Sequence, residues 1–179
     1  MPFKPPTAEE IHASRLGKLF GPRLRDPRLW LKRRRSVALG VALGVFFGLL
    51  IPLGQFMLSG AAAILLRANL PMAMVSTLIT NPVTFGPIYV AAYRTGSLML
   101  GEDIDEEQMA EALAGAEADS GLLGWLGGVG KPLALGLLVF ASAGSVLAYW
   151  GIRLTWTLAV LRRRRAQRKR FQLRERKPA

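Results

Sequence analysis

Residues 132–152 contain no charged side chain over 21 consecutive positions, and this run limits the fold more than any other feature of the chain. As an α-helix the run would be about 31 Å long, which matches a bilayer hydrocarbon core of about 30 Å. Tyr149 and Trp150 lie at its C-terminal end, and four consecutive arginines start at Arg162. An aromatic belt followed by a basic stop is typical of a membrane crossing. The sequence therefore predicts a transmembrane helix within residues 132–161.

Charged residues are concentrated outside two apolar regions. Residues 1–35 hold ten basic and three acidic residues, residues 102–119 hold eight acidic residues and no basic one, and residues 162–179 hold ten basic residues and Glu175. Basic residues that flank apolar segments mark the cytoplasmic side of a membrane. We therefore expect both termini in the cytoplasm, an even number of crossings, and the acidic segment on the opposite side.

Five regions follow from this distribution. We expect a basic cytoplasmic arm with an interfacial helix, a membrane region of broken or re-entrant helices, an acidic extracytoplasmic loop with a glycine-rich connector, a transmembrane helix and a polybasic cytoplasmic tail. These regions are residues 1–35, 36–101, 102–131, 132–161 and 162–179. The predicted fold class is an all-α, multi-pass integral membrane protein with a few transmembrane helices and Pro/Gly-broken or re-entrant hairpins.

Residues 36–53 form the first apolar block, directly after a run of basic residues. Gly40, Gly44 and Gly48 recur at every fourth position, so a helix would carry them on one face. Small residues on one face let a neighbouring membrane helix approach closely. We interpret these glycines as a helix-packing face rather than as a flexible segment. A cleavable signal peptide does not fit, because the block starts behind a long polar arm and further apolar sequence follows it.

Prolines interrupt the apolar sequence that follows. A proline removes a backbone donor and pushes the residue before it out of the helical region, so Pro52 and Pro82 predict helix ends at Ile51 and Asn81. Residues 56–66 would form a helix of about 16 Å, which is half of a bilayer. Such half-crossings indicate re-entrant hairpins. Open backbone at that depth must be buried in protein or line a polar cavity.

Polar residues near these breaks are the candidate ligand-binding residues. Arg67 and Arg94 are the only charged residues of the segment 36–101, and a guanidinium group within a span suits a phosphate or carboxylate. Either arginine would be a simple anchor if it lay at the membrane surface. Asn81 and Pro82 are equally well explained as a helix cap and turn. The candidates are Gln55, Arg67, Asn69, Asn81, Thr84, Tyr93 and Arg94.

The chain lacks the side chains of common catalytic and metal sites. It has no cysteine and one histidine, His12, which argues against thiolate chemistry, metal sites and a catalytic triad. The acidic segment lacks the spacing of an EF-hand loop and instead predicts a short amphipathic helix over residues 105–115, with Asp105 as its cap. We expect no cofactor, no metal and no enzyme activity.

The basic segments indicate a membrane-surface partner. A polybasic run beside a membrane span attracts anionic lipid, and this interpretation is favoured over nucleic-acid binding. So few crossings cannot enclose a pathway alone, so a homo-oligomer is expected. The expected partners are anionic membrane lipids and further copies of the chain, with no nucleic acid.

Several motifs together resemble a known family. They are IPLGQ, LLRANLPMA, TNPVTFGPIY and a following Tyr-Arg-x-Gly, over roughly residues 26–152. The chain resembles the bacterial inner-membrane family called domain of unknown function 2062. This resemblance implies a small integral protein of the bacterial cytoplasmic membrane and supplies no catalytic residues. Its most specific positions are Pro52, Gly54, Gln55, Arg67, Asn69, Pro71, Asn81, Pro82, Thr84, Tyr93, Arg94 and Gly96.

Two functions fit the sequence. In the first, the protein transports or binds an anionic small molecule or lipid head group at its broken helices. In the second, it is a non-catalytic membrane scaffold or assembly factor, whose glycine face and basic ends bind partner proteins and anionic lipid.

Overall fold

The structure is a computed structural model. It describes residues 21, 23, 26–31, 33–51, 54–117 and 130–175. The regular elements of these residues are helices, without a strand, so the all-helical part of the predicted fold is confirmed. Pro52, most of the basic arm and most of the glycine-rich connector lie outside the described residues. Before the first long helix the structure describes one 3-10 turn, η1 (Pro27–Leu29).

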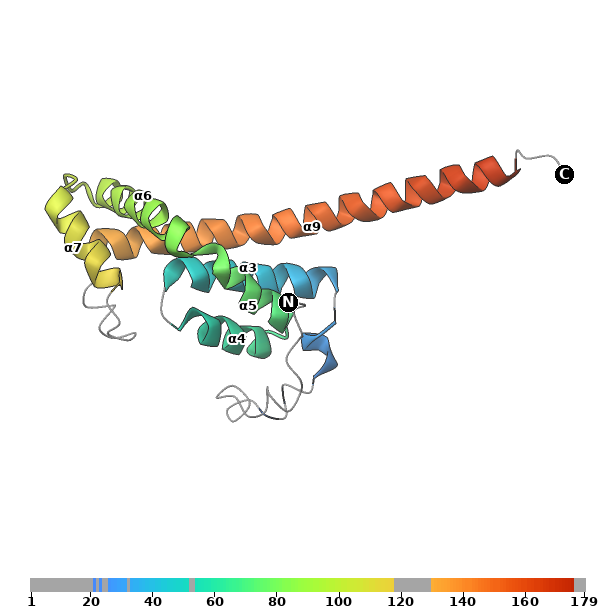
Figure 1. The fold of residues 1–179 in the computed structure, drawn as a ribbon, viewed down its shortest axis with the longest axis horizontal. Helices are drawn as coiled ribbons and strands as arrows, with labels where there is room; N and C mark the ends of the chain where they lie inside the picture. The colour runs from blue at the N-terminus through green and yellow to red at the C-terminus, as the bar shows by residue number, and fades with distance from the viewer. Residues whose placement is uncertain are drawn as a thin grey trace.

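The longest helix is α9 (Lys131–Glu175), with 45 residues. Its segment Lys131–Arg162 is the one helical segment of the described chain that is long and apolar enough to cross a membrane, by length and composition. The basic C-terminal part of α9 extends past all the other helices (Figure 1).

Helices α3 (Arg34–Leu50) and α4 (Gln55–Leu65) form an antiparallel hairpin. The predicted helix end at Ile51 is confirmed, because Ile51 has extended backbone angles there. Gly54 then adopts a left-handed conformation, with φ of 74°, immediately before α4. The half-length helix predicted over residues 56–66 is present as α4, whose 11 residues run back along α3.

Three further helical segments follow: α5 (Leu70–Ser76), the 3-10 turn η2 (Thr77–Ile79) and α6 (Pro82–Leu100). Segments α5 and η2 pack on α3, whereas α6 packs on α9. The chain therefore changes its packing partner at the predicted break before Pro82.

Both α3 and α6 run antiparallel to α9 and cover successive parts of it (Figure 1). The start of α3 lies beside Thr157, since the Arg34 guanidinium donates a hydrogen bond to its hydroxyl. The end of α3 lies beside Ala141, which clusters with Leu49. Beyond that level α6 continues toward the start of α9, where Gly96 meets Pro132.

A second apolar cluster joins α6, the start of α9 and the short helix α7 (Glu106–Glu117). Its buried members include Tyr93, Ala112 and Leu133. The Asp105 carboxylate accepts hydrogen bonds from the amides of Glu107 and Gln108. The amphipathic helix predicted over residues 105–115, with Asp105 as its cap, is therefore present.

Candidate functional site

The two predicted breaks meet at the end of α3. The Thr80 hydroxyl donates a buried hydrogen bond of 2.6 Å to the Gly48 carbonyl, three residues before Ile51. Ile51 and the segment from Gly54 form one break, and Thr80 with Asn81 forms the other. We call this region the break junction. The junction lies near Ala141 of α9 because Ala141 packs in one cluster with Leu49 of α3.

The glycine face of α3 packs on the segment that leads into the second break. Gly40, Gly44 and Gly48 face the backbone of Asn69, Ala73 and Thr77 in turn, with α5 and η2 running parallel to α3. A Cβ atom at Gly40 would lie 2.5 Å from the Asn69 carbonyl oxygen, and one at Gly48 would lie 2.8 Å from that of Thr77. The glycine face is thus occupied within the chain.

The hairpin helix α4 is tied to the same surface by a buried hydroxyl. Ser59 donates a hydrogen bond of 3.0 Å to the Ala73 carbonyl, at the level where Gly44 contacts Ala73. This bond joins α4 to α5 at the level where α5 packs on Gly44 of α3. It therefore fixes the hairpin beside the interrupted segment.

Two polar side chains close to the junction are buried without a hydrogen-bond partner among the described residues. The unpaired atoms are Oε1 of Gln55 and the hydroxyl oxygen of Tyr89. The exposed fraction is 8% for Gln55 and 0% for Tyr89. Tyr89 stacks on Phe85 at 4.0 Å between ring centroids and shares an apolar cluster with Ile51. Leu58, one turn after Gln55, packs on that cluster. A buried polar group without a partner costs about 1–3 kcal/mol, so these groups need a further explanation.

The amide side chain of Asn69 has a structural task. Its Oδ1 atom accepts a hydrogen bond from the Met72 amide at the start of α5, and its Nδ2 group donates to the Leu31 carbonyl at 3.3 Å. Its backbone amide donates to the Ser36 carbonyl. Asn69 therefore caps α5 and connects it to the chain that leads into α3.

Asn81 and Thr84 are likewise used in a helix cap. The Asn81 Oδ1 atom accepts from the amides of Val83 and Thr84, and the Thr84 hydroxyl accepts from the Asn81 amide at 3.0 Å. The helix end predicted at Asn81 is therefore the start of α6. The structure contains the cap and turn predicted at Asn81 and Pro82, with Pro82 at the first helical position of α6.

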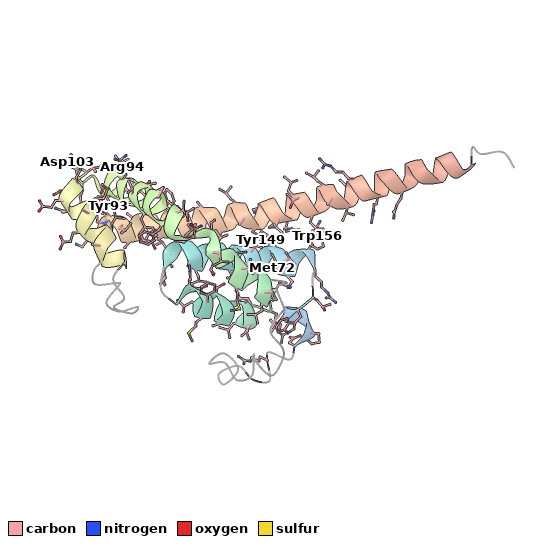
Figure 2. All side chains as sticks on the ribbon, viewed as in Figure 1. Met72, Tyr93, Arg94, Asp103, Tyr149 and Trp156 are labelled. Atoms are coloured by element: carbon pink, nitrogen blue, oxygen red, sulfur yellow. The ribbon has the colours of Figure 1, made fainter. Side chains whose placement is uncertain are left out.

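The three other candidates lie at different places. Tyr93 is buried in the cluster of α6, α7 and α9, with 2% of its surface exposed. Arg94 is exposed on α6 (Figure 2). Arg67 is exposed in the turn between α4 and α5, where its guanidinium lies 3.9 Å from the Asp26 carboxylate.

Arg67 and Arg94 do not share one site. Arg67 follows the end of α4 and precedes Asn69, which is bonded to the start of α3 near Thr157. Arg94 lies two residues before Gly96, which contacts the start of α9. Along α9 the two levels are separated by more than 20 residues, or about 35 Å. They therefore mark opposite ends of the segment formed by α5, η2 and α6.

Arg67 has an unusual backbone conformation. Its φ of 53° is the one left-handed non-glycine value among the described residues. The Ala68 amide donates to the Ala63 carbonyl and the Arg67 amide to that of Ile64, as in a Schellman C-cap, where glycine is preferred. An L-residue there costs roughly 1–2 kcal/mol. A strained arginine at a glycine position is a candidate for function.

Charges of opposite sign gather at the two ends of the structure. The basic end holds Arg34, Arg153 and Arg162, because the start of α3 lies beside Thr157. The acidic end holds the residues from Glu102 to the start of α7, which packs on α6. In the described chain, no cluster of three His, Cys, Asp or Glu side chains could hold a metal ion.

Sequence reasoning missed one close contact. Gly96 of α6 and Gly136 of α9 face the backbones of Pro132 and Ala92, so closely that a Cβ atom at either position would overlap a carbonyl group. The pair Ala92 and Gly96, four residues apart, is the signal that would have found this contact. Ser59 was also missed, and one serine in an apolar segment gives no such signal.

The fold and charge distribution define an all-helical protein with an apolar helix of membrane-crossing length, a broken partner segment and a short hairpin. Residues 17–165 match the family described as "Uncharacterized protein conserved in bacteria (DUF2062)". The chain belongs to this family, and the predicted family is thereby confirmed. No curated protein and no solved structure matches the chain.

Proposed function

We propose that this chain is a multi-pass protein of the bacterial cytoplasmic membrane that binds and transports an anionic small molecule or lipid head group at the break junction. In this proposal α9 crosses the membrane once, and α5, η2 and α6 form one interrupted crossing. The hairpin of α3 and α4 enters from the basic side and returns to it. Both termini then lie in the cytoplasm, as the basic residues at that end require.

The depth of the junction supports this placement. In the uncharged stretch 132–152 of α9, Ala141 lies about 14 Å from the acidic end and about 16 Å from the basic end. Ala141 is at the level where α3 ends, so both breaks would lie near the middle of the bilayer. Open backbone at that depth requires a polar or protein-lined environment.

The observation that carries the functional proposal is the bond from Thr80 to Gly48 beside the unpaired atoms of Gln55 and Tyr89. The side chains of Thr80, Asn81 and Thr84 form hydrogen bonds with backbone groups at the helix ends, so a structural role is sufficient to explain these three residues. Gln55 Oε1 and the Tyr89 hydroxyl have no such structural task. We infer that they contact a polar molecule that enters the junction.

The arginines fit the same pathway. Arg67 and Arg94 would stand near the two membrane surfaces at either end of the interrupted crossing. Exposed guanidinium groups at those positions would attract an anion to each entrance. The strained backbone of Arg67 supports a role for its side chain beyond anchoring.

The sequence and the packing fit a transport function better than an enzymatic function or a scaffold function. Residues 36–101 contain no carboxylate that could act as a general base at the junction. The glycine face, which a scaffold would offer to partners, is covered by α5 and η2. A homo-oligomer is part of the proposal, because two crossings and one hairpin are too few helices to enclose a pathway.

A lipid-translocation assay tests the proposal. Vesicles that contain the purified chain and fluorescent phosphatidylglycerol are treated with dithionite, which bleaches the label only where it is exposed. The fluorescence of the label in the inner leaflet should be lost faster than in vesicles without the protein. Gln55→Leu and Tyr89→Phe should each slow the decay by up to about tenfold, the effect of one lost hydrogen bond of 1–1.5 kcal/mol.

Ser142→Ala is the matched control, because Ser142 is a polar residue at the same level of α9 but is exposed, whereas the neighbouring Ala141 is buried against α3. It should leave the rate unchanged. An assay with labelled inorganic phosphate separates a free anion from a lipid head group. The proposal is wrong if neither probe crosses faster than in empty vesicles, or if both junction variants behave as Ser142→Ala.

A further inference from the structure

A groove lies between the start of α3 and the C-terminal part of α9, well away from the break junction. Its volume is about 490 Å³, within the range of about 300–1,000 Å³ typical of small-molecule sites. One wall is Val37 of α3, and the other is a single face of α9 (Figure 2 labels Trp156). The residues on α9 are Ile152, Thr155, Trp156, Ala159 and Val160.

The residues that line the groove suit contact with a hydrocarbon chain. Five of the six residues are apolar, and Thr155 already donates its hydroxyl to the carbonyls of Gly151 and Ile152 within α9. Trp156 keeps 36% of its surface exposed. The groove therefore offers hydrocarbon contact and has few free polar groups to hold a small polar ligand.

Arginines surround this apolar groove. Arg34 bonds to Thr157 through one guanidinium nitrogen, at 2.9 Å, and its other donors remain available. Arg153 follows Ile152 directly and lies over the rings of Tyr149 and Trp150, at 5.6 and 5.2 Å from the centroids. These contacts direct the guanidinium toward Tyr149 and Trp150, which precede the Ile152 end of the groove.

The surrounding charge is of one sign. Arg33 and Arg35 are exposed on either side of Arg34, and Arg162 is exposed two residues after Val160, so all three lie at the C-terminal end of the groove. The acidic residues from Glu102 to Glu117 belong to the opposite end of the structure, and Asp26 is placed beside Arg67. An apolar groove with a basic rim matches a ligand that has a hydrocarbon chain and an anionic head.

We propose that this groove binds one anionic phospholipid, with an acyl chain along Trp156 and Ile152 and the phosphate group beside Arg34. The guanidinium groups bind phosphate oxygens, often in bidentate fashion, and a neutral zwitterionic lipid offers less net charge to them. The site rests on the membrane placement proposed above, because it lies at the basic end of the α9 crossing. It does not depend on transport at the break junction.

Quenching of tryptophan fluorescence by brominated lipids tests the site. The full chain carries Trp30→Phe, Trp125→Phe and Trp150→Phe, which leave Trp156 as the only tryptophan. Vesicles of phosphatidylcholine receive increasing fractions of either acyl-brominated phosphatidylglycerol or acyl-brominated phosphatidylcholine. We expect the anionic lipid to reach half-maximal quenching at a several-fold lower fraction.

Two matched pairs of variants locate the binding. Arg34→Gln should reduce the preference for the anionic lipid about fivefold, the value of one basic residue near a membrane surface, whereas Lys131→Gln removes one positive charge at the start of α9 and should not. Ala159→Leu narrows the groove and should weaken quenching, whereas Ala143→Leu on an exposed part of α9 should not. Circular dichroism establishes that each variant keeps its helices.

The outcomes separate the two proposals. Equal quenching by both lipids, or equal effects of Arg34→Gln and Lys131→Gln, overturns the anionic-lipid site and leaves the membrane placement intact. Absence of quenching by either lipid overturns both. If Ala159→Cys forms disulfide-linked dimers in this cysteine-free chain, the groove is instead a contact between two copies, and the lipid proposal is wrong.

Discussion

Substitution of Gly44 by alanine tests the packing of the glycine face on α5. A Cβ atom at this position would lie 2.6 Å from the Ser76 Cβ atom and would overlap the Ala73 carbonyl oxygen. Non-bonded carbon atoms prefer about 3.5–4.0 Å, so α3 and α5 would have to separate by roughly 1 Å. Backbone on both sides leaves no flexible side chain to move aside. We therefore expect Gly44→Ala to destabilise the protein.

The magnitude follows from three terms. Overpacking of a close contact costs about 1–3 kcal/mol. The separation also stretches the bond from Ser59 to the Ala73 carbonyl, and one buried hydrogen bond contributes about 1 kcal/mol. Alanine returns about 1 kcal/mol through its better helix propensity. The net loss in the free energy of unfolding should be about 2 kcal/mol.

Thermal unfolding in detergent measures this loss. For a chain of this size, 2 kcal/mol corresponds to a fall in Tm of about 4–8 °C. Gly151→Ala is the matched control, because an added Cβ atom at Gly151 of α9 has no neighbouring atom within 4 Å. It should leave the Tm unchanged or raise it. If Gly44→Ala and Gly151→Ala unfold at the same temperature, α5 does not pack on the glycine face as described.

Three further predictions use the same measurement. Asn81→Ala removes the cap of α6 and should cost about 1 kcal/mol, with Ser142→Ala as the neutral reference. Gly136→Ala should lower the Tm more than Gly151→Ala, because its Cβ atom would overlap the Ala92 carbonyl; equal Tm values would refute the contact of α6 with α9. Arg67→Gly should raise the unfolding free energy by about 1 kcal/mol, since glycine adopts the left-handed conformation without strain, and yet should slow translocation; a lower Tm would show that the arginine side chain stabilises the turn.

The helix ends could be predicted because their causes are local. Proline and the residue before it determine the breaks at Ile51 and before Pro82, whatever the rest of the chain does. The length of α4 follows from the breaks on either side. The cap formed by Asn81 and Thr84 spans three residues, so the sequence was sufficient to propose it.

The contacts between distant segments could not be predicted in the same way. The spacing of Gly40, Gly44 and Gly48 indicates a packing face but does not say which helix covers it. The bond from Asn69 to Leu31 joins residues 38 positions apart. The left-handed backbone of Arg67 also escapes sequence reasoning, because glycine is the residue that normally signals this conformation. Such features depend on how the helices pack, which no local pattern encodes.

The interruption before α6, which proline determines locally, lets the chain pack on two different helices. Segment α5 fits against the glycine face of α3, whereas α6 fits against α9 through Gly96 and Gly136, so one straight helix could not make both contacts. The break exposes backbone groups; Asn81 accepts from the first amides of α6, and the Thr84 hydroxyl donates to the Ile79 carbonyl.

Proline and the cap of α6 account for the interruption, but they do not explain why Gln55 and Tyr89 bring polar atoms to the same region. Leucine and phenylalanine would fill those positions without leaving a buried group unpaired. A chain under selection for stability alone would favour that exchange. In the proposed function these two atoms contact the molecule that enters the break junction, whereas the similarly unpaired hydroxyls of Ser36 and Ser97 lie elsewhere among the described residues.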